Sequence, residues 1–216
     1  MAEPARLVLA TRSAGKLPEL IALCASHGIA AESAAAAGLA EDPAEAGIEV
    51  HDTFAANAEA KARWFAARLG GRVVLADDSG LEVAALGGAP GVHSKRWSGT
   101  ALHGQALDDA NNARLAAELV DVADRRARYR CVVVATDGTH VWRGDGRVEG
   151  RIATAPEGRG GFGYDPWFIS DELGVTFGVA APEEKARVSH RARAVAACLA
   201  SAGDALRCAV RHVPRL

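Results

Sequence analysis

Two adjacent carboxylates form the strongest chemical signal in the sequence. Asp77 and Asp78 follow the apolar run Arg72–Ala76 and precede Ser79-Gly80. A buried strand that ends in this way presents hard oxygen ligands at the edge of a sheet, where ligands usually bind. One or two carboxylates together with substrate phosphates are the usual ligands of Mg²⁺, which polarises a phosphoryl oxygen or activates a water. The alternative is an Asx turn that only caps the strand.

A second segment carries the features of an anion site. Gly15-Lys16 follows the short apolar strand predicted over Arg6–Thr11 and begins a helix predicted over Leu17–His27. Free backbone N–H groups and the helix dipole favour an anion at such a helix start, and Lys16 adds a positive charge. The segment is not a P-loop, since that motif requires glycine at position 10 and a hydroxyl residue at position 17. A helix-starting turn with an exposed lysine is the alternative interpretation.

Two segments nearer the C-terminus carry stacking and donor groups. Glycines in Gly158–Pro166 let a backbone approach a flat ligand closely and leave the Phe162 ring free to stack. Lys185, His190 and Arg191 lie within two turns of the last predicted helix, and Arg and His suit carbonyl or phosphate oxygens. The alternatives are a tight turn before a strand and a solvated helix end with salt links.

The elements that must position these groups mix strands and helices without strict alternation. Periodicity and turn signals predict strands over 6–11, 72–76, 129–136, 139–147 and 167–169, with a weak strand between 28 and 52. They predict helices over 17–27, from Asp52 or Thr53 to about 69, over 102–120 and from about 182 onward. Asn57 and Lys61 share one face of the second helix, downstream of the acidic residues Glu45, Glu49 and Asp52. We therefore expect an α/β fold with a mixed central sheet flanked by helices, in a single domain over residues 1–216.

Composition and charge exclude several classes of protein. A net charge of −2 and a pI near 6.4 indicate no excess of positive charge that would attract nucleic acid. Cys24, Cys131, Cys198 and Cys208 form no CxxC pair and no metal-binding spacing, which indicates free thiols in a reducing compartment. The N-terminus lacks the pattern of a signal peptide, and no stretch reaches the ~18 apolar residues of a membrane span. We expect a cytoplasmic protein that binds neither nucleic acid nor membrane.

Five sequence blocks occur together in a characteristic order. They are ATRSAGK from Ala10, TFAANAEAKA from Thr53, ADDSGLEVAALGGAPGVHSKRWSG from Ala76, GRGGFGYDPWF from Gly158 and EEKARVSHRARA from Glu183. The DDSGLEV…LGGAPGV and GGFGYDP blocks are long and highly specific. In this order, the blocks resemble the inosine triphosphate pyrophosphatase (XTP/dITP diphosphatase) family, and the resemblance runs from Leu7 to about Ala197.

The resemblance implies an elongated mixed sheet with helices on two lobes and a nucleotide cleft between them, usually in a homodimer. It also implies Mg²⁺-dependent hydrolysis of the purine nucleoside triphosphates ITP, dITP and XTP to the monophosphate and pyrophosphate, which keeps deaminated purines out of DNA and RNA. Adenine is discriminated against if donors face O6 of the base, because adenine presents an amino group there. We expect these donors on His190 and Arg191.

The resemblance further assigns roles to residues. Asp78 corresponds to the catalytic proton acceptor and to a metal ligand, with Asp77 beside it. Glu49 fits the second metal ligand best, counting back from Thr53-Phe54, and Glu45 is the fallback. The N-terminal loop is expected to hold the phosphates, and the FGYD segment to hold the base by stacking and backbone contacts. The substrate-binding positions are Thr11, Arg12, Ser13, Ala14, Gly15, Lys16, Ser79, Phe162, Gly163, Tyr164, Asp165, Lys185, His190 and Arg191.

Three departures from the family pattern and two alternative functions bear on this interpretation. Ser13 stands where the family normally has Asn, extra residues precede Thr53, and Gly178–Ala180 replaces a common Ala-Glu-Leu. A Maf-like pyrophosphatase of modified pyrimidines is one alternative, against which the GGFGYDP and SHR blocks argue. A nucleotide sensor without turnover is the other, against which the intact pair of aspartates argues.

Overall fold

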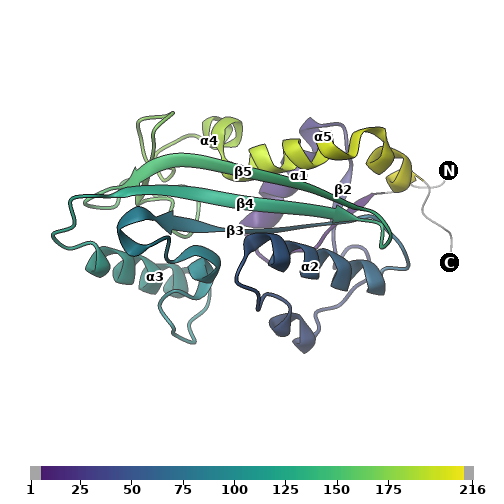
Figure 1. Cartoon of the computed structure of the whole chain (residues 1–216), viewed down its shortest axis with the longest axis horizontal. Coiled ribbons are helices and arrows are strands. Elements are labelled where there is room, and N and C mark those ends of the chain that lie inside the picture. Colours follow the sequence, from purple (N-terminus) through teal and green to yellow (C-terminus); the bar gives the residue numbers. More distant parts are fainter. Residues whose placement is uncertain (1–5, 212–216) are drawn as a thin grey trace. The chain divides into compact units, whose positions relative to one another are not determined.

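A six-stranded sheet with the strand order β2-β1-β3-β4-β5-β6 is the framework of the chain (Figure 1). The computed structural model describes residues 6–211, so Met1–Ala5 and His212–Leu216 of the predicted domain lie outside the described residues. β1 pairs in parallel with β2 and β3, whereas β5 pairs antiparallel with β6, which confirms the predicted mixed sheet. The strands are β1 (Leu7–Leu9), β2 (Ala31–Ser33), β3 (Val74–Val83), β4 (Arg126–Thr136), β5 (Val141–Ile152) and β6 (Phe168–Ser170).

Five α-helices and three short 3₁₀ helices connect these strands within the described residues. The second helix begins where the sequence predicts, because the Thr53 hydroxyl accepts a hydrogen bond from the backbone N–H of Ala56. The α-helices are α1 (Lys16–Ser26), α2 (Phe54–Arg68), α3 (Gly104–Glu118), α4 (Pro182–Val188) and α5 (His190–Arg211). The 3₁₀ helices are η1 (Pro43–Gly47), η2 (Ala84–Leu86) and η3 (Gly91–Arg96).

The chain divides into two compact units, which are described separately. Unit 1 contains the chain up to Asp78, Cys131–Gly146 and the segment from Arg191 onward. Unit 2 contains Ser79–Arg130 and Arg147–His190. The division falls inside β3, β4 and β5 and directly before Arg191. The single domain and the nucleotide cleft expected from the sequence stay predictions.

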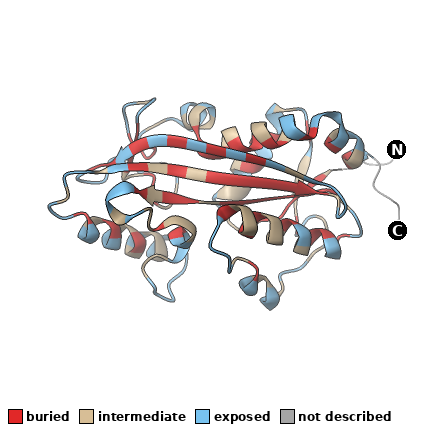
Figure 2. Cartoon of the chain, in the orientation of Figure 1, coloured by how far each residue is buried: buried red, intermediate tan, exposed pale blue. Residues whose placement is uncertain are grey.

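The core of unit 1 consists of apolar side chains on both sides of β1 and the first part of β3. Leu7 and Leu9 point to one side, where Leu20, Leu23 and Cys24 of α1 and the buried residues of α5 pack. Val8 alternates to the other side, and Figure 1 shows α2 on the side of the strands opposite α1 and α5. Burial on both faces explains why these strands are continuous apolar runs (Figure 2).

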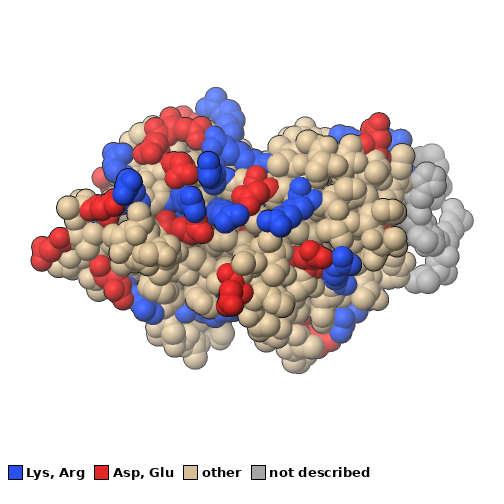
Figure 3. Space-filling model, in the orientation of Figure 1, with Lys and Arg blue, Asp and Glu red and all other residues tan. Residues whose placement is uncertain are grey.

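Unit 2 is built around a second, more aromatic core. Tyr129 of β4 packs with Phe168 of β6 and with Phe177, while Leu115 of α3 and Leu119, directly after that helix, also contribute. β5 alternates buried and exposed residues along its length, so one of its faces meets solvent (Figure 2). On the face drawn in Figure 3, basic and acidic side chains are interspersed, and neither sign forms a continuous patch.

Several boundaries differ from the sequence predictions, and two of them concern the candidate site. β3 does not end at Ala76 but continues through the four residues Asp77–Gly80 to Val83, because further apolar residues, Leu81 and Val83, bury beyond them. The last predicted helix is interrupted at Ser189, which has the extended angles φ −64° and ψ 148°. Serine favours the position before a helix over its interior, so α5 starts afresh at His190. Among the described residues, no helix is both long and apolar enough to cross a membrane.

We predict that Gly144→Ala destabilises the protein strongly. A Cβ atom at this position would lie 2.1 Å from the carbonyl oxygen of Ala194 and 2.2 Å from the backbone nitrogen of Cys198, so α5 must shift away from β5. We expect the free energy of unfolding, measured with urea, to fall by about 3 kcal/mol. Gly47→Ala is the matched control, because no atom lies within 4 Å of the added carbon. An equal effect of both substitutions would contradict the tight packing of α5 on Gly144.

Candidate active site

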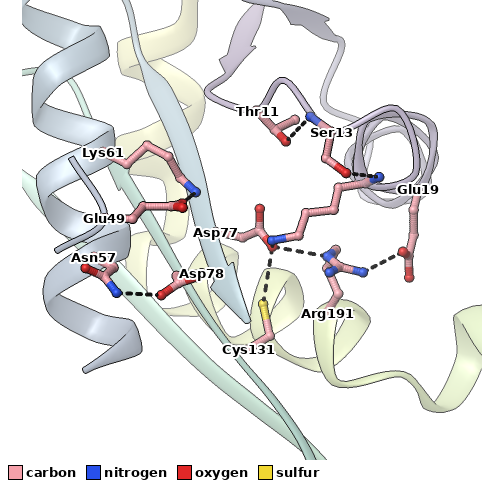
Figure 4. A network of polar contacts seen from close by, with 11 residues as sticks. Thr11, Ser13, Glu19, Glu49, Asn57, Lys61, Asp77, Asp78, Cys131 and Arg191 are labelled. Atoms are coloured by element: carbon pink, nitrogen blue, oxygen red, sulfur yellow. Dashed lines mark hydrogen bonds and ion pairs between the residues drawn. The ribbon is translucent and has the colours of Figure 1, made fainter. Parts of the chain in front are cut away.

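The two carboxylates of β3 point to opposite sides of the strand. β1 ends at Leu9, and the last hydrogen bond along it runs from the Ala10 N–H to the Leu75 carbonyl. Asp77 and Asp78 therefore lie just beyond the end of β1, next to the loop that leads into α1. Successive side chains of a strand alternate between its faces, so Asp77 meets α1 and α5 while Asp78 meets α2 (Figure 4).

Asp77 is fully buried and paired with two cations. Its Oδ2 atom lies 3.1 Å from Lys16 Nζ and 3.3 Å from Arg191 Nε. Arg191 in turn donates to Glu19 of α1 at 2.6 Å, and its own side chain is 2 % exposed. Burial alone would raise the pKa of Asp77, but the charges of Lys16 and Arg191 outweigh it and hold that pKa far below its ordinary value. Asp77 therefore stays ionised and anchors both cations.

Asp78 has a different environment, although it is the next residue. Its Oδ2 atom accepts a hydrogen bond of 2.9 Å from Asn57 Nδ2, and burial is the main reason that its pKa is raised. Asn57 also bonds both backbone polar groups of His51, at 2.9 and 3.1 Å. Asn57 thereby ties Asp78 to the acidic segment before α2. The sequence placed Asn57 on a helix face without predicting this contact.

Glu49 belongs to the same network. It forms an ion pair with Lys61 of α2 (Figure 4). Burial would raise the pKa of Glu49, but the charges of Lys61 and Lys16 lower it overall, while the charge of Asp77 opposes them. Glu49 is thus close enough to Lys16 and Asp77 to interact electrostatically with both. Lys61, which the sequence placed only on a helix face, has its pKa raised by Glu49 and Asp77 against the effect of burial.

Glu45, the alternative metal ligand, has a structural partner instead. Arg12 holds both carboxylate oxygens of Glu45, at 3.0 and 2.8 Å. The same guanidinium donates to the carbonyls of Leu39 and Ala40 and lies 5.5 Å from the centre of the Phe65 ring. Arg12 and Glu45 therefore fasten the segment before α2 to the loop after β1. Glu45 and Glu49 are thus each paired with a cation, and the choice between them as a metal ligand stays a prediction, as does a substrate contact of Arg12.

The loop from Thr11 to Lys16 is held by its own hydroxyl groups. The Ser13 N–H donates to Thr11 Oγ1 at 3.2 Å, and Ser13 Oγ accepts from the Lys16 N–H at 3.4 Å (Figure 4). Ser13, which replaces the family's asparagine, thus bonds one of the free N–H groups at the start of α1. Lys16 itself reaches Asp77 with its ammonium group and keeps 19 % of its side chain exposed.

In unit 2, a second group of predicted residues gathers around Asp165. Its Oδ2 atom accepts from the Phe162 N–H at 2.8 Å and from Lys185 Nζ of α4 at 2.7 Å. The Lys185 ammonium lies 5.0 Å from the centre of the Phe162 ring and 5.4 Å from that of Phe177. The Tyr164 side chain is buried, and its hydroxyl donates to the Ser94 carbonyl at 2.8 Å. Phe162 and Lys185 thus form one cation–π pair on this loop.

Two glycines of this loop allow close contacts within the protein that a side chain would block. A Cβ atom at Gly158 would lie 2.1 Å from the Gly178 carbonyl oxygen, and one at Gly161 would lie 2.0 Å from the Asp165 carboxylate. The tight turn, which was the alternative interpretation of the motif, accounts for these two glycines. The backbone groups of Phe162 and Asp165 also bond to each other, from the Asp165 N–H to the Phe162 carbonyl at 3.3 Å.

His190 and Arg191 have separate environments, although the sequence predicts that they read the base together. The buried His190 ring stacks on Tyr129 of unit 2, with centroids 4.7 Å apart and planes 9° apart. The Arg191 guanidinium instead lies against Asp77 and Glu19 in unit 1. The break at Ser189 separates both residues from the helix of Lys185. A base contact of His190, Arg191 or Ser79 stays a prediction.

Comparisons with known proteins agree with one another. A model of the Ham1 family matches residues 7–201. The chain is 47 % identical to a dITP/XTP pyrophosphatase of Ralstonia nicotianae, over 88 % of this chain and 93 % of the relative. It is 46 % identical to a dITP/XTP pyrophosphatase of Geobacillus kaustophilus, over 88 % and 90 %. A solved Ham1 protein from Coxiella burnetii has a TM-score of 0.75 and 33 % identity, over 89 % of this chain and 95 % of that one.

We predict that the two aspartates contribute unequally to stability. Asp77→Asn removes the carboxylate shared by the buried Arg191 and the partly exposed Lys16, so we expect a loss of ~3–5 kcal/mol in the free energy of unfolding. Asp78→Asn keeps an oxygen that can accept from Asn57, so we expect a change of less than ~1 kcal/mol. Urea unfolding at pH 7 without divalent metal measures both, and a similar loss for the two variants would contradict the separate environments.

Proposed function

The chain belongs to the Ham1 family, and on this premise we propose that it is a divalent-metal-dependent pyrophosphatase of dITP, XTP and ITP. The products are the nucleoside monophosphate and pyrophosphate. The observation that carries the proposal is the difference between two neighbouring carboxylates: Asp77 pairs with Lys16 and Arg191, whereas Asp78 lies on the opposite side of β3 and accepts a hydrogen bond from Asn57. Such a pair supplies an anchor for phosphate-binding cations and a carboxylate for the reaction.

Lys16 and the start of α1 bind the phosphates in this proposal. The Lys16 ammonium is partly exposed and is held at the end of β1 by Asp77, where an incoming triphosphate meets a positive charge and the N-terminus of a helix. Neighbouring loop residues from Thr11 to Gly15 add backbone N–H groups. Arg191 acts through Asp77, because its guanidinium is bound to Asp77 and Glu19.

The acidic residues of unit 1 fit a divalent metal, and we propose Mg²⁺. Asp78 and Glu49 offer hard oxygen ligands that both contact α2, through Asn57 and Lys61 respectively. Within residues 6–211, no group of three or more His, Cys, Asp or Glu side chains suits a metal, so the phosphates must supply further ligands. This is the usual pattern for Mg²⁺, whose bound charge would offset that of the phosphate oxygens.

The reaction is the attack of a water on the α-phosphorus. Asp78 accepts a proton from the water while the oxygen of that water forms its bond to phosphorus. The bond between the α-phosphorus and the bridging oxygen breaks, and pyrophosphate leaves with both electrons of that bond. Lys16 neutralises charge that builds up on the phosphate oxygens, so catalysis is mainly positioning and electrostatics.

The base is held in unit 2 by the loop around Asp165. Phe162 is half-buried, and the Lys185 ammonium lies over one face of its ring, so a flat base would stack on the other face, near a hydrogen-bond donor. A donor that faces O6 accepts hypoxanthine or xanthine and opposes the amino group of adenine. Tyr164 contributes by packing, because its hydroxyl donates to the Ser94 carbonyl rather than to the base.

We also propose a cytoplasmic location and a homodimer. The location is supported by four free cysteines, of which Cys24, Cys131 and Cys198 are buried. The homodimer rests on the family resemblance. Neither a Maf-like enzyme nor a sensor without turnover is favoured, because the relatives compared above are named dITP/XTP pyrophosphatases and both aspartates are intact.

We predict that the purified protein releases pyrophosphate from dITP, XTP and ITP far faster than from ATP, and only with a divalent metal. Asp78→Asn should lower this activity to less than about a tenth, because it removes a metal ligand and the proton acceptor with little change in volume. A pyrophosphate-release assay on a panel of triphosphates, with and without Mg²⁺, measures both. Preference for modified pyrimidines would favour the Maf-like alternative, and binding without turnover would favour a sensor.

We predict further that Glu49→Gln raises the Mg²⁺ concentration needed for half-maximal activity at least about tenfold. Glu45→Gln is the matched control: it disturbs the pair with Arg12 and should leave the Mg²⁺ requirement within about twofold of the unaltered protein. A Mg²⁺ titration of the two variants decides between the residues. If the order of the effects is reversed, Glu45 is the metal ligand.

A further inference from the structure

Two side chains of α3 hold one residue of the Phe162–Asp165 loop from both sides. Asp108 Oδ2 accepts a hydrogen bond of 2.9 Å from the Gly163 N–H. Asn112 Nδ2 donates a hydrogen bond of 3.0 Å to the Gly163 carbonyl. Asp108 and Asn112 are four residues apart and share one face of the helix. Both polar backbone groups of Gly163 are therefore bound by α3.

Gly163 is a position at which contacts from outside the loop can fix its conformation. Its φ of +60° lies in the left-handed region, and it follows directly after Phe162, whose ring lies below the Lys185 ammonium. Other parts of the loop are tied by Asp165, which binds the Phe162 N–H and Lys185. Without α3, Gly163 would lose the partners of both its polar backbone groups, and the peptide before it would keep the bond from the Asp165 N–H to the Phe162 carbonyl, so the Phe162 ring would be held less firmly.

The same helix also braces the segment against which the loop packs. Asn111 accepts from the Ser98 N–H at 2.7 Å and donates to the Lys95 carbonyl at 3.0 Å. Directly before Lys95, the Ser94 carbonyl accepts the Tyr164 hydroxyl at 2.8 Å. α3 therefore fixes Gly163 directly and Tyr164 through this segment.

We propose that Asp108 and Asn112 are positioning residues that set the place of the Phe162 ring and thereby the affinity for the purine base. The inference rests on the proposed function, since it takes Phe162 as the stacking surface. Neither residue takes part in the reaction at the phosphates. Loss of either contact weakens base binding and leaves the chemical step unchanged.

The test compares substitutions of Asp108 and Asn112 with a substitution of the neighbouring residue Asp109. Asn112→Leu removes the donor at similar volume, and Asp108→Ala removes the acceptor. Asp108→Asn keeps an oxygen that can accept from the Gly163 N–H. Asp109→Ala is the control, because Asp109 is exposed and its side chain, within the described part of the chain, accepts a hydrogen bond only from Gln105.

Two measurements are made on each variant: steady-state kinetics with dITP and Mg²⁺, and amide hydrogen exchange of residues 161–166 without nucleotide. We expect Asn112→Leu and Asp108→Ala each to raise KM about fivefold, with kcat changed less than about twofold, as fits one lost hydrogen bond. Exchange in the loop should become faster in both. Asp108→Asn and Asp109→Ala should behave like the unaltered protein in both measurements.

Several outcomes overturn the proposal. Unchanged exchange in Asn112→Leu and Asp108→Ala means that α3 does not hold the loop. Faster exchange with an unchanged KM means that the loop's position does not matter for the base, and a fall in kcat alone assigns the residues to the reaction. If the unaltered protein does not hydrolyse dITP, the proposed function fails instead. Amide hydrogen exchange still reports separately whether α3 holds the loop.

Discussion

The burial of Asp77 is the constraint on which the candidate site depends. A carboxylate without exposed surface is tolerated only if cations and hydrogen bonds compensate for its lost hydration. Lys16 supplies one positive charge from the start of α1, and Arg191 supplies the other from the start of α5. Arg191 is balanced in turn by Glu19. Within unit 1, the Asp77 Oδ2 atom therefore fixes the positions of the first turns of α1 and α5 relative to β3.

This constraint also explains why two adjacent aspartates can differ in function. The pleat of β3 turns Asp77 toward the cations and Asp78 toward Asn57 and the acidic segment that contains Glu49. Asp77 keeps Lys16 at the end of β1, ready for phosphate, and the carboxylate of Asp78 is left for metal and water in the proposed reaction. An arrangement with both side chains on one face would place two negative charges together and raise one pKa strongly.

In unit 2, polar contacts hold the loop around Asp165, in addition to the burial of Tyr164 in the apolar core. The loop around Asp165 satisfies its own polar groups, and two of its glycines are required by contacts of less than 2.2 Å that any Cβ atom would make. α3 adds the contacts of Asp108 and Asn112 to Gly163. A preorganised stacking surface loses less entropy when a base binds, which favours affinity without any further contact to the ligand.

Local sequence determined the features that depend on neighbouring residues. The mixed α/β fold, the cap at Thr53, the hairpin turn after Thr136 and the chemical types gathered in five blocks all follow from short-range patterns. Only the tertiary structure decided that Arg191 pairs with Asp77, 114 residues away, and that Glu45 is held by Arg12. It also decided that β3 continues past its aspartates and that the last helix breaks at Ser189. The reason is physical: ion pairs and burial join residues that are distant in the chain, and neither periodicity nor spacing specifies which distant partner a charge will meet.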